Sequence, residues 1–274
     1  MPVVLNFHGG GGNAQGQADY SRMDSLADEM GFVAVYPNGT GRLADRLLTW
    51  NAGTCCGYAR DQKVDDVGFT RAVIADLATR TSIDPVRIYA TGLSNGAMMA
   101  YRLAAEAPDL VTAIAPVAGA MTLELIQGSP PVPVMHIHSV DDPRALYGGG
   151  LGPPFPFTNQ RVDHNPVEAI LAAWAQNNGC PDSPTETAAR RSRPDPRGPE
   201  HSAIRLEYGP CSSGADVVLW KLTGAGHVWP GAERDYLKRI LGPGTDVIDA
   251  NLEMWRFFDG YPREPQPGRV PGEP

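Results

Sequence analysis

Short runs rich in β-branched residues alternate with longer helical patterns from one end of this chain to the other. This alternation is typical of a mostly parallel sheet that is covered by helices on both faces, and we therefore predict an α/β fold. The predicted strands are Val3–Phe7, Phe32–Tyr36, Arg87–Ala90, Ala113–Val117, Val134–Ile137 and Val217–Leu222. Helices are predicted near Gln17–Met30, Asp66–Thr79, Ala97–Ala105, Val167–Asn177 and Asp246–Phe258.

Two segments and the tail interrupt this pattern. Residues 146–166 hold a glycine triplet and several prolines, so we predict a surface loop near the functional edge of the sheet. Residues 181–200 are predicted to form a mobile excursion, and residues 261–274 a poorly ordered proline-rich tail. Since 42% of the 274 residues are hydrophobic, one large core is possible, and we predict a single domain over residues 1–260.

The charge pattern excludes some classes of partner. The net charge of −8 is spread along the chain without a basic run, which argues against nucleic acids and anionic membranes. No stretch approaches the roughly 20 apolar residues of a membrane span. We therefore expect a small-molecule or polymer substrate. Four cysteines are compatible with an oxidising compartment but do not decide it.

The sequence Gly92-Leu93-Ser94-Asn95-Gly96 stands between a predicted strand and a predicted helix. This G-x-S-x-G context is the one that a nucleophile elbow requires, because the sharp turn tolerates only glycine on either side and lifts the serine hydroxyl above the sheet. The alternative is a glycine-rich helix start with a capping serine. We predict an α/β-hydrolase fold with Ser94 as the nucleophile.

A serine nucleophile needs a base, and the base needs a carboxylate to orient it. On this fold the chain order is Ser, then acid, then His. His227 follows the last predicted strand and is the predicted base. Asp141 and Asp142 both follow the strand Val134–Ile137, and the position leaves both open as the acid.

An oxyanion hole needs two backbone N–H groups directed at the developing negative charge. One is predicted to come from Asn95, the residue after the nucleophile. The other is predicted to come from the glycine run after the first strand, with Gly10 as the first choice and Gly11 as the alternative. The run lacks the residues of a phosphate-binding loop.

His136 and His138 alternate on one face of a predicted strand, a spacing that a metal site could use. No cysteine or carboxylate is obviously placed with them, so core packing or hydrogen bonding behind the site is the preferred interpretation. We predict no metal and no organic cofactor.

Six linked motifs occur in order and together resemble the polyhydroxybutyrate depolymerase and feruloyl esterase family of secreted esterases. The resemblance covers nearly all of Pro2 to Phe258. The motifs are His8-Gly9-Gly10-Gly11-Gly12-Asn13, Tyr36-Pro37-Asn38-Gly39, Trp50-Asn51-Ala52-Gly53-Thr54-Cys55-Cys56-Gly57, Val64-Asp65-Asp66-Val67-Gly68-Phe69, Gly92-Leu93-Ser94-Asn95-Gly96 and Gly226-His227-Val228-Trp229-Pro230-Gly231.

The resemblance implies Ser94, Asp142 and His227 as the catalytic triad. Members of the family carry the acid in an H-x-H-G-T-x-D-P stretch, which residues 136–143 match with Ser139-Val140 in place of Gly-Thr and with a second acid at Asp141.

The resemblance also bears on the cysteines and on the compartment. It implies a disulfide between Cys180 and Cys211, while Cys55 and Cys56 form either a vicinal disulfide or two separate thiols. Similar enzymes are secreted and begin with a leader and additional strands. We therefore expect a secreted or periplasmic protein whose first strands are missing here.

Aromatic faces bind phenolic and polyester groups well, so Trp50 and Trp229 are predicted walls of the substrate pocket, with ordinary packing as the alternative. The predicted activity is hydrolysis of feruloyl, other aryl or acetyl esters, or of hydroxyalkanoate polyesters, through an acyl-enzyme. The alternatives are an acyltransferase that uses an alcohol other than water and, further removed, a non-catalytic polymer-binding module.

Overall fold

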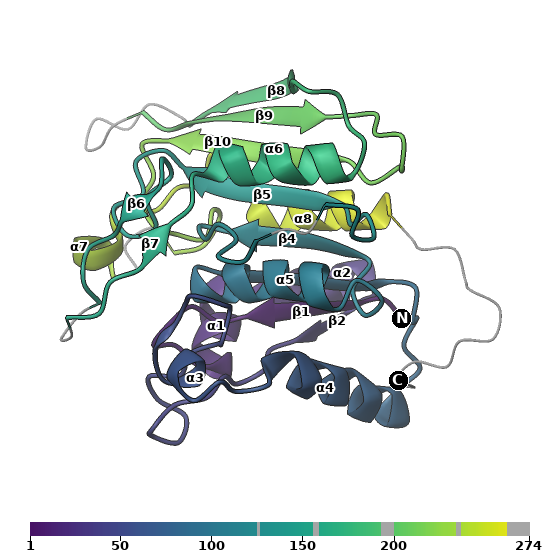
Figure 1. Cartoon of the computed structure of the whole chain (residues 1–274), viewed down its shortest axis with the longest axis vertical. Coiled ribbons are helices and arrows are strands. Elements are labelled where there is room, and N and C mark those ends of the chain that lie inside the picture. Colours follow the sequence, from purple (N-terminus) through teal and green to yellow (C-terminus); the bar gives the residue numbers. More distant parts are fainter. Residues whose placement is uncertain (125–126, 156–158, 193–199, 234–236, 262–274) are drawn as a thin grey trace.

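The computed structural model describes residues 1–124, 127–155, 159–192, 200–233 and 237–261. Within these residues eight strands form one sheet in the order β2-β1-β3-β4-β5-β10-β9-β8 (Figure 1). The six strands from β2 to β10 run parallel, and β9 and β8 are antiparallel to their neighbours. The strands are β1 Val3–Phe7, β2 Val33–Val35, β3 Ile88–Leu93, β4 Ala113–Val117, β5 Val134–Ser139, β8 Thr185–Arg191, β9 Ser202–Tyr208 and β10 Val217–Thr223.

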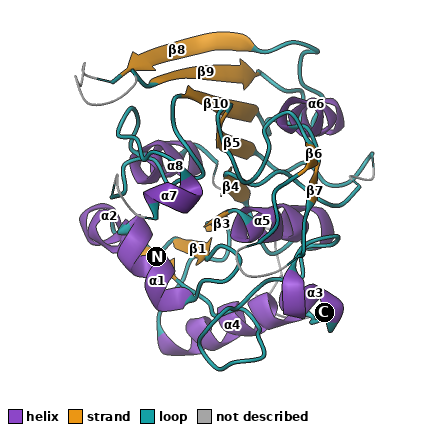
Figure 2. Ribbon diagram, turned by 90° about the vertical axis from the view of Figure 1, so that its left-hand side faces the viewer, coloured by secondary structure: helices purple, strands orange, loops and turns teal. Residues whose placement is uncertain are grey.

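Helices cover both faces of the sheet (Figure 2). One face packs against α4, α5 and α6, and the other against α1, α2 and α8. The helices are α1 Ala14–Ser21, α2 Met23–Met30, α3 Gly57–Asp61, α4 Asp66–Arg80, α5 Asn95–Glu106, α6 Val167–Asn177, α7 Lys238–Leu241 and α8 Ala250–Asp259.

The central strands are buried on both sides, as parallel strands between two helical layers must be. In β1, Val3, Leu5 and Phe7 enter one core and Val4 enters the other, because successive side chains point to opposite faces. All six predicted strands form. The continuous apolar runs therefore predicted the centre of the sheet correctly.

The segment of residues 181–200 corrects one prediction. It was expected to be a mobile excursion, but Thr185–Arg191 forms the edge strand β8, which pairs with β9. Neither β8 nor β9 was predicted. Most side chains of β8 are exposed, so its sequence carries threonine, glutamate and arginine instead of an apolar alternation. Residues 193–199 lie outside the described residues.

The predicted loop of residues 146–166 contains a short two-stranded ribbon, β6 Gly150–Leu151 and β7 Asp163–His164. The parallel strands end on the left of Figure 1, and the ribbon lies at that edge. The segment therefore lies where the sequence placed it, near the carboxyl ends of the strands. Residues 156–158 and 262–274 lie outside the described residues.

Both cysteine pairs are formed. Cys180 at the end of α6 is bonded to Cys211 in the connection from β9 to β10, which confirms the implied disulfide. The bond closes the segment that carries β8 and β9. Cys55 and Cys56 pair with each other. Among the described residues, no helix has the length and apolar character needed to cross a membrane.

Candidate active site

Ser94 occupies a sharp turn between β3 and α5. Its backbone has φ 57° and ψ −116°, a left-handed conformation that L-residues seldom adopt. A β-carbon on Gly96 would overlap the carbonyl oxygen of Phe7, and one on Gly92 would lie 2.6 Å from the same oxygen. Glycine is therefore required at both positions, and the serine side chain is turned away from the sheet, as a nucleophile elbow requires.

The neighbouring strand β4 supports this turn. The Ser94 N–H donates to the carbonyl oxygen of Val117 at 2.8 Å. Gly119 packs against the Ser94 backbone: a β-carbon on Gly119 would overlap the Ser94 carbonyl oxygen and lie 2.9 Å from the Ser94 carbonyl carbon. The backbone of Ser94 is thus fixed by contacts that allow no added atom.

We predict that Gly119→Ala lowers the free energy of unfolding by about 2–3 kcal/mol, because the new methyl group must displace the Ser94 backbone. The matched control is Gly148→Ala, since a β-carbon there meets nothing within 4 Å. That variant should stay within about 0.5 kcal/mol of the parent. Urea denaturation of the three proteins measures both values, and equal stability of the two variants would contradict the packing argument.

The predicted base and acid are hydrogen-bonded. His227 Nδ1 donates to Asp142 Oδ2 at 2.7 Å, and both side chains are buried. Asp142 Oδ1 accepts the backbone N–H groups of Arg144 and Ala145 at 2.7 and 2.9 Å. Burial alone would raise the pKa of Asp142, but the interactions with His227 and His138 outweigh burial and hold the pKa well below its usual range. Asp142 therefore stays ionised beside His227.

Asp141 is directed elsewhere. Its Oδ2 accepts the backbone N–H of Gly224 at 2.6 Å and so ties β5 to the loop after β10. The structure therefore favours Asp142 over Asp141 as the partner of His227. The loop that carries His227 is itself fixed, since His227 N–H donates to Leu241 O at 2.6 Å.

Ser94 and His227 both lie at the carboxyl edge of the sheet, after β3 and after β10. Within the part of the chain that the structure describes, the Ser94 hydroxyl makes no hydrogen bond. Catalytic hydrogen bonds often tighten only when substrate is bound.

The two predicted oxyanion donors lie side by side. A β-carbon on Gly10 would lie 3.6 Å from Cβ of Asn95. The N–H of Gly11 is already engaged with Leu48 O at 2.8 Å, whereas the N–H of Gly10 has no partner among the described residues. Asn95 is the first residue of α5, where backbone N–H groups lack intrahelical acceptors. This arrangement favours Gly10 over Gly11.

The Asn95 side chain fixes a third segment at the site. Its Oδ1 accepts Trp50 N–H at 2.7 Å, and its Nδ2 donates to Trp50 O at 3.0 Å. The Trp50 indole N–H donates to His8 O at 3.0 Å. The elbow, the glycine loop and the segment around Trp50 therefore form one hydrogen-bonded unit.

The prediction that Trp50 and Trp229 form walls of the substrate pocket is wrong. Their exposed fractions are 0% and 1%, so neither indole is available as a pocket wall. Trp50 packs edge-on against Phe7 with ring centroids 5.0 Å apart, and the Trp229 indole N–H donates to Asn251 Oδ1 at 2.9 Å. Their large apolar surface is used to fix the site loops from within the core.

His8 links the glycine loop to the segment around Gly39, and its two hydrogen bonds fit a single tautomer of the ring. Nδ1 donates to Gly9 O at 2.8 Å, and Nε2 accepts the Gly39 N–H at 3.0 Å. Burial lowers the pKa of His8 to about 4, although the hydrogen bond to Gly9 opposes the shift. The ring is therefore neutral at pH 7, as its acceptor role requires.

Because the pKa of His8 is lower in the folded than in the unfolded chain, protons bind the unfolded chain more readily between these values. We predict that this contribution to stability is full above about pH 6.5 and falls by about 3 kcal/mol as the pH drops to about 4. His8→Asn lacks this titration. The stability difference between parent and variant should shrink from pH 7 to pH 4, and a constant difference would contradict the assignment.

Phe155 was not predicted as a site residue. Its ring lies 3.5 Å from the position of a β-carbon on Gly10, and it packs against a buried cluster that includes Met98 and Val162. The segment that carries β6 and β7 therefore reaches the oxyanion loop. The only sequence signal was the predicted placement of residues 146–166 at this edge.

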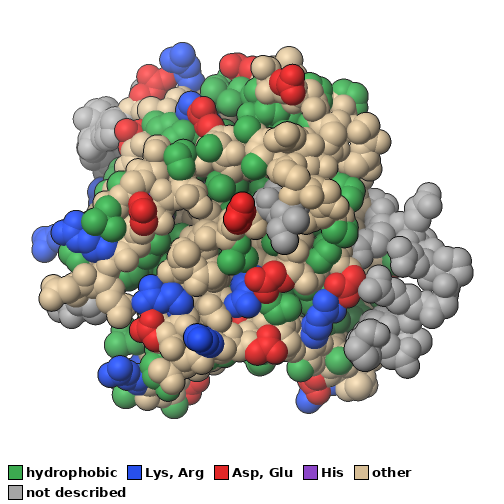
Figure 3. All heavy atoms as spheres, in the orientation of Figure 1, with side chains coloured by type: hydrophobic (Ala, Val, Ile, Leu, Met, Phe, Trp, Pro, Cys, Tyr) green, Lys and Arg blue, Asp and Glu red, His purple; other side chains and the backbone are tan. Residues whose placement is uncertain are grey.

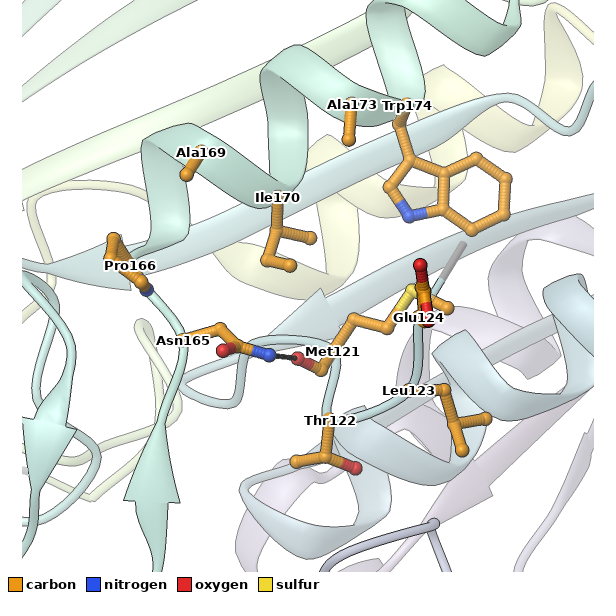
Figure 4. A pocket seen from close by; sticks show the side chains of 10 residues that line it. All are labelled: Met121, Thr122, Leu123, Glu124, Asn165, Pro166, Ala169, Ile170, Ala173 and Trp174. Carbon is orange, nitrogen blue, oxygen red and sulfur yellow. Dashed lines mark hydrogen bonds between the residues drawn. The ribbon is translucent and has the colours of Figure 1, made fainter. Parts of the chain in front are cut away.

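A pocket of about 400 Å³ lies between α6 and the segment that follows β4 (Figure 4). That segment continues from Gly119, which contacts the Ser94 backbone. The Asn165 side chain donates to Met121 O at 2.9 Å across the pocket. The lining residues, mostly apolar, are Met121, Thr122, Leu123, Glu124, Asn165, Pro166, Ala169, Ile170, Ala173 and Trp174.

The parallel sheet, the two helical layers and the strained serine after β3 define an α/β-hydrolase. Comparison with known families shows which family within this fold the chain belongs to. The sequence profile of the family described as esterase PHB depolymerase matches residues 1–173, which is more than half of the chain. The chain belongs to this esterase family, and the resemblance seen in its motifs is confirmed.

Several curated relatives agree with this assignment. A putative esterase, NocK, from Nocardia uniformis subsp. tsuyamanensis is 30% identical over 254 residues, which cover 88% of this chain and 69% of the relative. Feruloyl esterase B from Piromyces equi is 28% identical over 82% of this chain, which spans only 39% of that protein's length.

Solved structures confirm the fold. An acetyl xylan esterase from Aspergillus awamori superposes with a TM-score of 0.53 at 16% identity, covering 94% of this chain and 89% of the other. Arabidopsis thaliana SOBER1 superposes with a TM-score of 0.51 at 12% identity, covering 92% of this chain and 98% of the other. At such identities the likeness concerns the fold alone.

Proposed function

We propose that this chain hydrolyses carboxylic esters through an acyl-enzyme formed on Ser94. The single observation that carries the proposal is the buried hydrogen bond of 2.7 Å between His227 and the ionised Asp142, at the sheet edge where the strained Ser94 is presented. His227 accepts the proton of Ser94 as the hydroxyl attacks the carbonyl carbon. Gly10 and Asn95 donate their N–H groups to the oxyanion.

The same groups serve the rest of the cycle. His227 returns its proton to the leaving alcohol, and the acyl group remains on Ser94. Water then enters and attacks the acyl carbon while His227 takes a proton from it. The bond between the acyl group and Ser94 breaks, the acid is released, and His227 returns the proton to the serine oxygen. These steps need no metal or organic cofactor, and Asp142 keeps His227 in the tautomer that the cycle requires.

The relatives bear on the substrate class. They include proteins named as feruloyl esterases and as acetylxylan esterases. We propose aryl, acetyl or hydroxyalkanoate esters as substrates for this chain. The apolar pocket beside α6 would hold the non-reacting part of the ester, with Phe155 beside the oxyanion loop.

The surface charge and the Cys180–Cys211 disulfide bear on the kind of substrate and on the compartment. On the face shown in Figure 3, acidic and basic side chains are interspersed and form no basic patch for a polyanion. The Cys180–Cys211 disulfide supports a protein that works in an oxidising compartment, secreted or periplasmic.

We predict that Ser94→Ala keeps the circular dichroism and thermal unfolding of the parent but lowers kcat/KM for a short nitrophenyl ester by at least about 10⁴-fold, because the nucleophile is removed. Ser183→Ala changes an exposed serine and serves as the control. Retained activity in Ser94→Ala would overturn the proposal. Product analysis with an added alcohol separates hydrolysis from acyl transfer.

The pocket is tested by a pair of variants on α6. Ala173 lines the pocket, whereas Ala172 is exposed and lies outside the lining. We predict that Ala173→Phe raises KM for methyl ferulate by about 10-fold through loss of pocket volume and leaves a short acetyl ester unaffected. Ala172→Phe should change neither. If the two variants behave alike, the pocket does not hold the substrate.

A further inference from the structure

Four buried polar side chains form a continuous line from α5 across β5 to the acid of the site. Tyr101 Oη lies 3.0 Å from His136 Nδ1, and His136 Nε2 lies 2.9 Å from His138 Nδ1. His138 Nε2 lies 3.2 Å from Asp142 Oδ2 and 2.8 Å from Ala145 O. The exposed fractions of Tyr101, His136, His138 and Asp142 are 0%, 0%, 2% and 4%.

One arrangement of protons satisfies this line with neutral rings. The carbonyl of Ala145 and the carboxylate of Asp142 only accept, so His138 Nε2 donates. His138 Nδ1 then accepts from His136 Nε2, and His136 Nδ1 accepts from the Tyr101 hydroxyl. Burial, as the main cause, holds the pKa of His136 well below its usual range. Burial raises the pKa of Tyr101, so the Tyr101 hydroxyl and the His136 ring both remain neutral.

The line ends on the oxygen that holds the base. Asp142 Oδ2 accepts from His227 at 2.7 Å and faces His138 Nε2 at 3.2 Å, while Oδ1 is held by the N–H groups of Arg144 and Ala145. The donors to Oδ1 leave Oδ2 as the oxygen shared by the two histidines. His138 therefore opposes rotation of the carboxylate away from His227.

We propose that His138, held in turn by His136 and Tyr101, is a positioning residue that acts through Asp142 to keep His227 oriented for catalysis. The inference rests on the proposed function, since it assigns a task to His138 only if His227 is the base. The steps of the hydrolytic cycle do not use the side chains of His138, His136 and Tyr101 directly. Since burying an unpaired polar group is costly, their burial as a hydrogen-bonded set needs another explanation.

Several titratable groups surround His138, and any pH dependence includes them. They are His136 on β5, Asp142 after β5, His227 after β10, His164 on β7, and Tyr147 before β6, whose ring centroid lies 5.7 Å from that of His138. Lys221 of β10 and Glu168 of α6 reach Tyr147 from outside.

The test compares His138→Leu with His138→Gln in the full chain. Leu removes the donor to Asp142, whereas the amide of Gln can replace Nε2–H. For a short nitrophenyl ester we expect His138→Leu to lower kcat by about 10- to 100-fold with KM nearly unchanged, and His138→Gln to restore kcat to within about 5-fold of the parent. The acid limb of the pH profile should move to higher pH in His138→Leu, because Asp142 then stabilises protonated His227 more strongly.

Tyr101→Phe keeps the core volume and removes only the far end of the line, so it tests the proposal if His138→Leu fails to fold. We expect about a 2- to 5-fold loss in kcat and a smaller shift of the acid limb in the same direction. Equal impairment of the Leu and Gln variants, or unchanged kcat and pH profile in His138→Leu and Tyr101→Phe, would overturn the role of His138. Activity in Ser94→Ala would instead overturn the proposed function itself.

Discussion

The close contact between the end of β1 and the turn at Ser94 is the constraint on which the site depends. The Phe7 carbonyl oxygen lies so near Gly92 and Gly96 that neither position has room for a β-carbon. The contact fixes β3 and α5 against β1, and it also fixes the start of the glycine loop, which follows Phe7 directly. One close packing of backbone segments therefore positions both the proposed nucleophile and the proposed oxyanion donor.

A second theme is the contrast between one ionised side chain and the neutral polar groups around it. Asp142 is charged because two histidines and two backbone N–H groups face it. His8 and His136 are buried without a carboxylate of their own and stay neutral, as their acceptor roles require. Asp142 therefore carries a negative charge beside His227, while the His8 and His136 rings carry no charge.

The parts of this structure that local backbone chemistry dictates were predictable from the sequence. The elbow, the order of acid and base, and the glycine loop each follow from residue types that the turn or the reaction demands. The role predicted for Trp50 and Trp229 was wrong, because a motif shows that an aromatic residue lies near a site but not whether its ring faces the site or the core. Strand β8 was missed because its exposed side chains carry no apolar pattern. The link from His138 to Tyr101 depends on packing between β5 and α5, which the sequence alone does not reveal.

Covalent labelling by a fluorophosphonate identifies the nucleophilic residue of this chain directly. Trypsin releases Ser94 in the peptide from Ile88 to Arg102, in which it is the only serine. We predict one adduct per chain, located by mass spectrometry on Ser94, together with complete loss of esterase activity. An unlabelled chain that hydrolyses esters, or an adduct on a different residue, would contradict it.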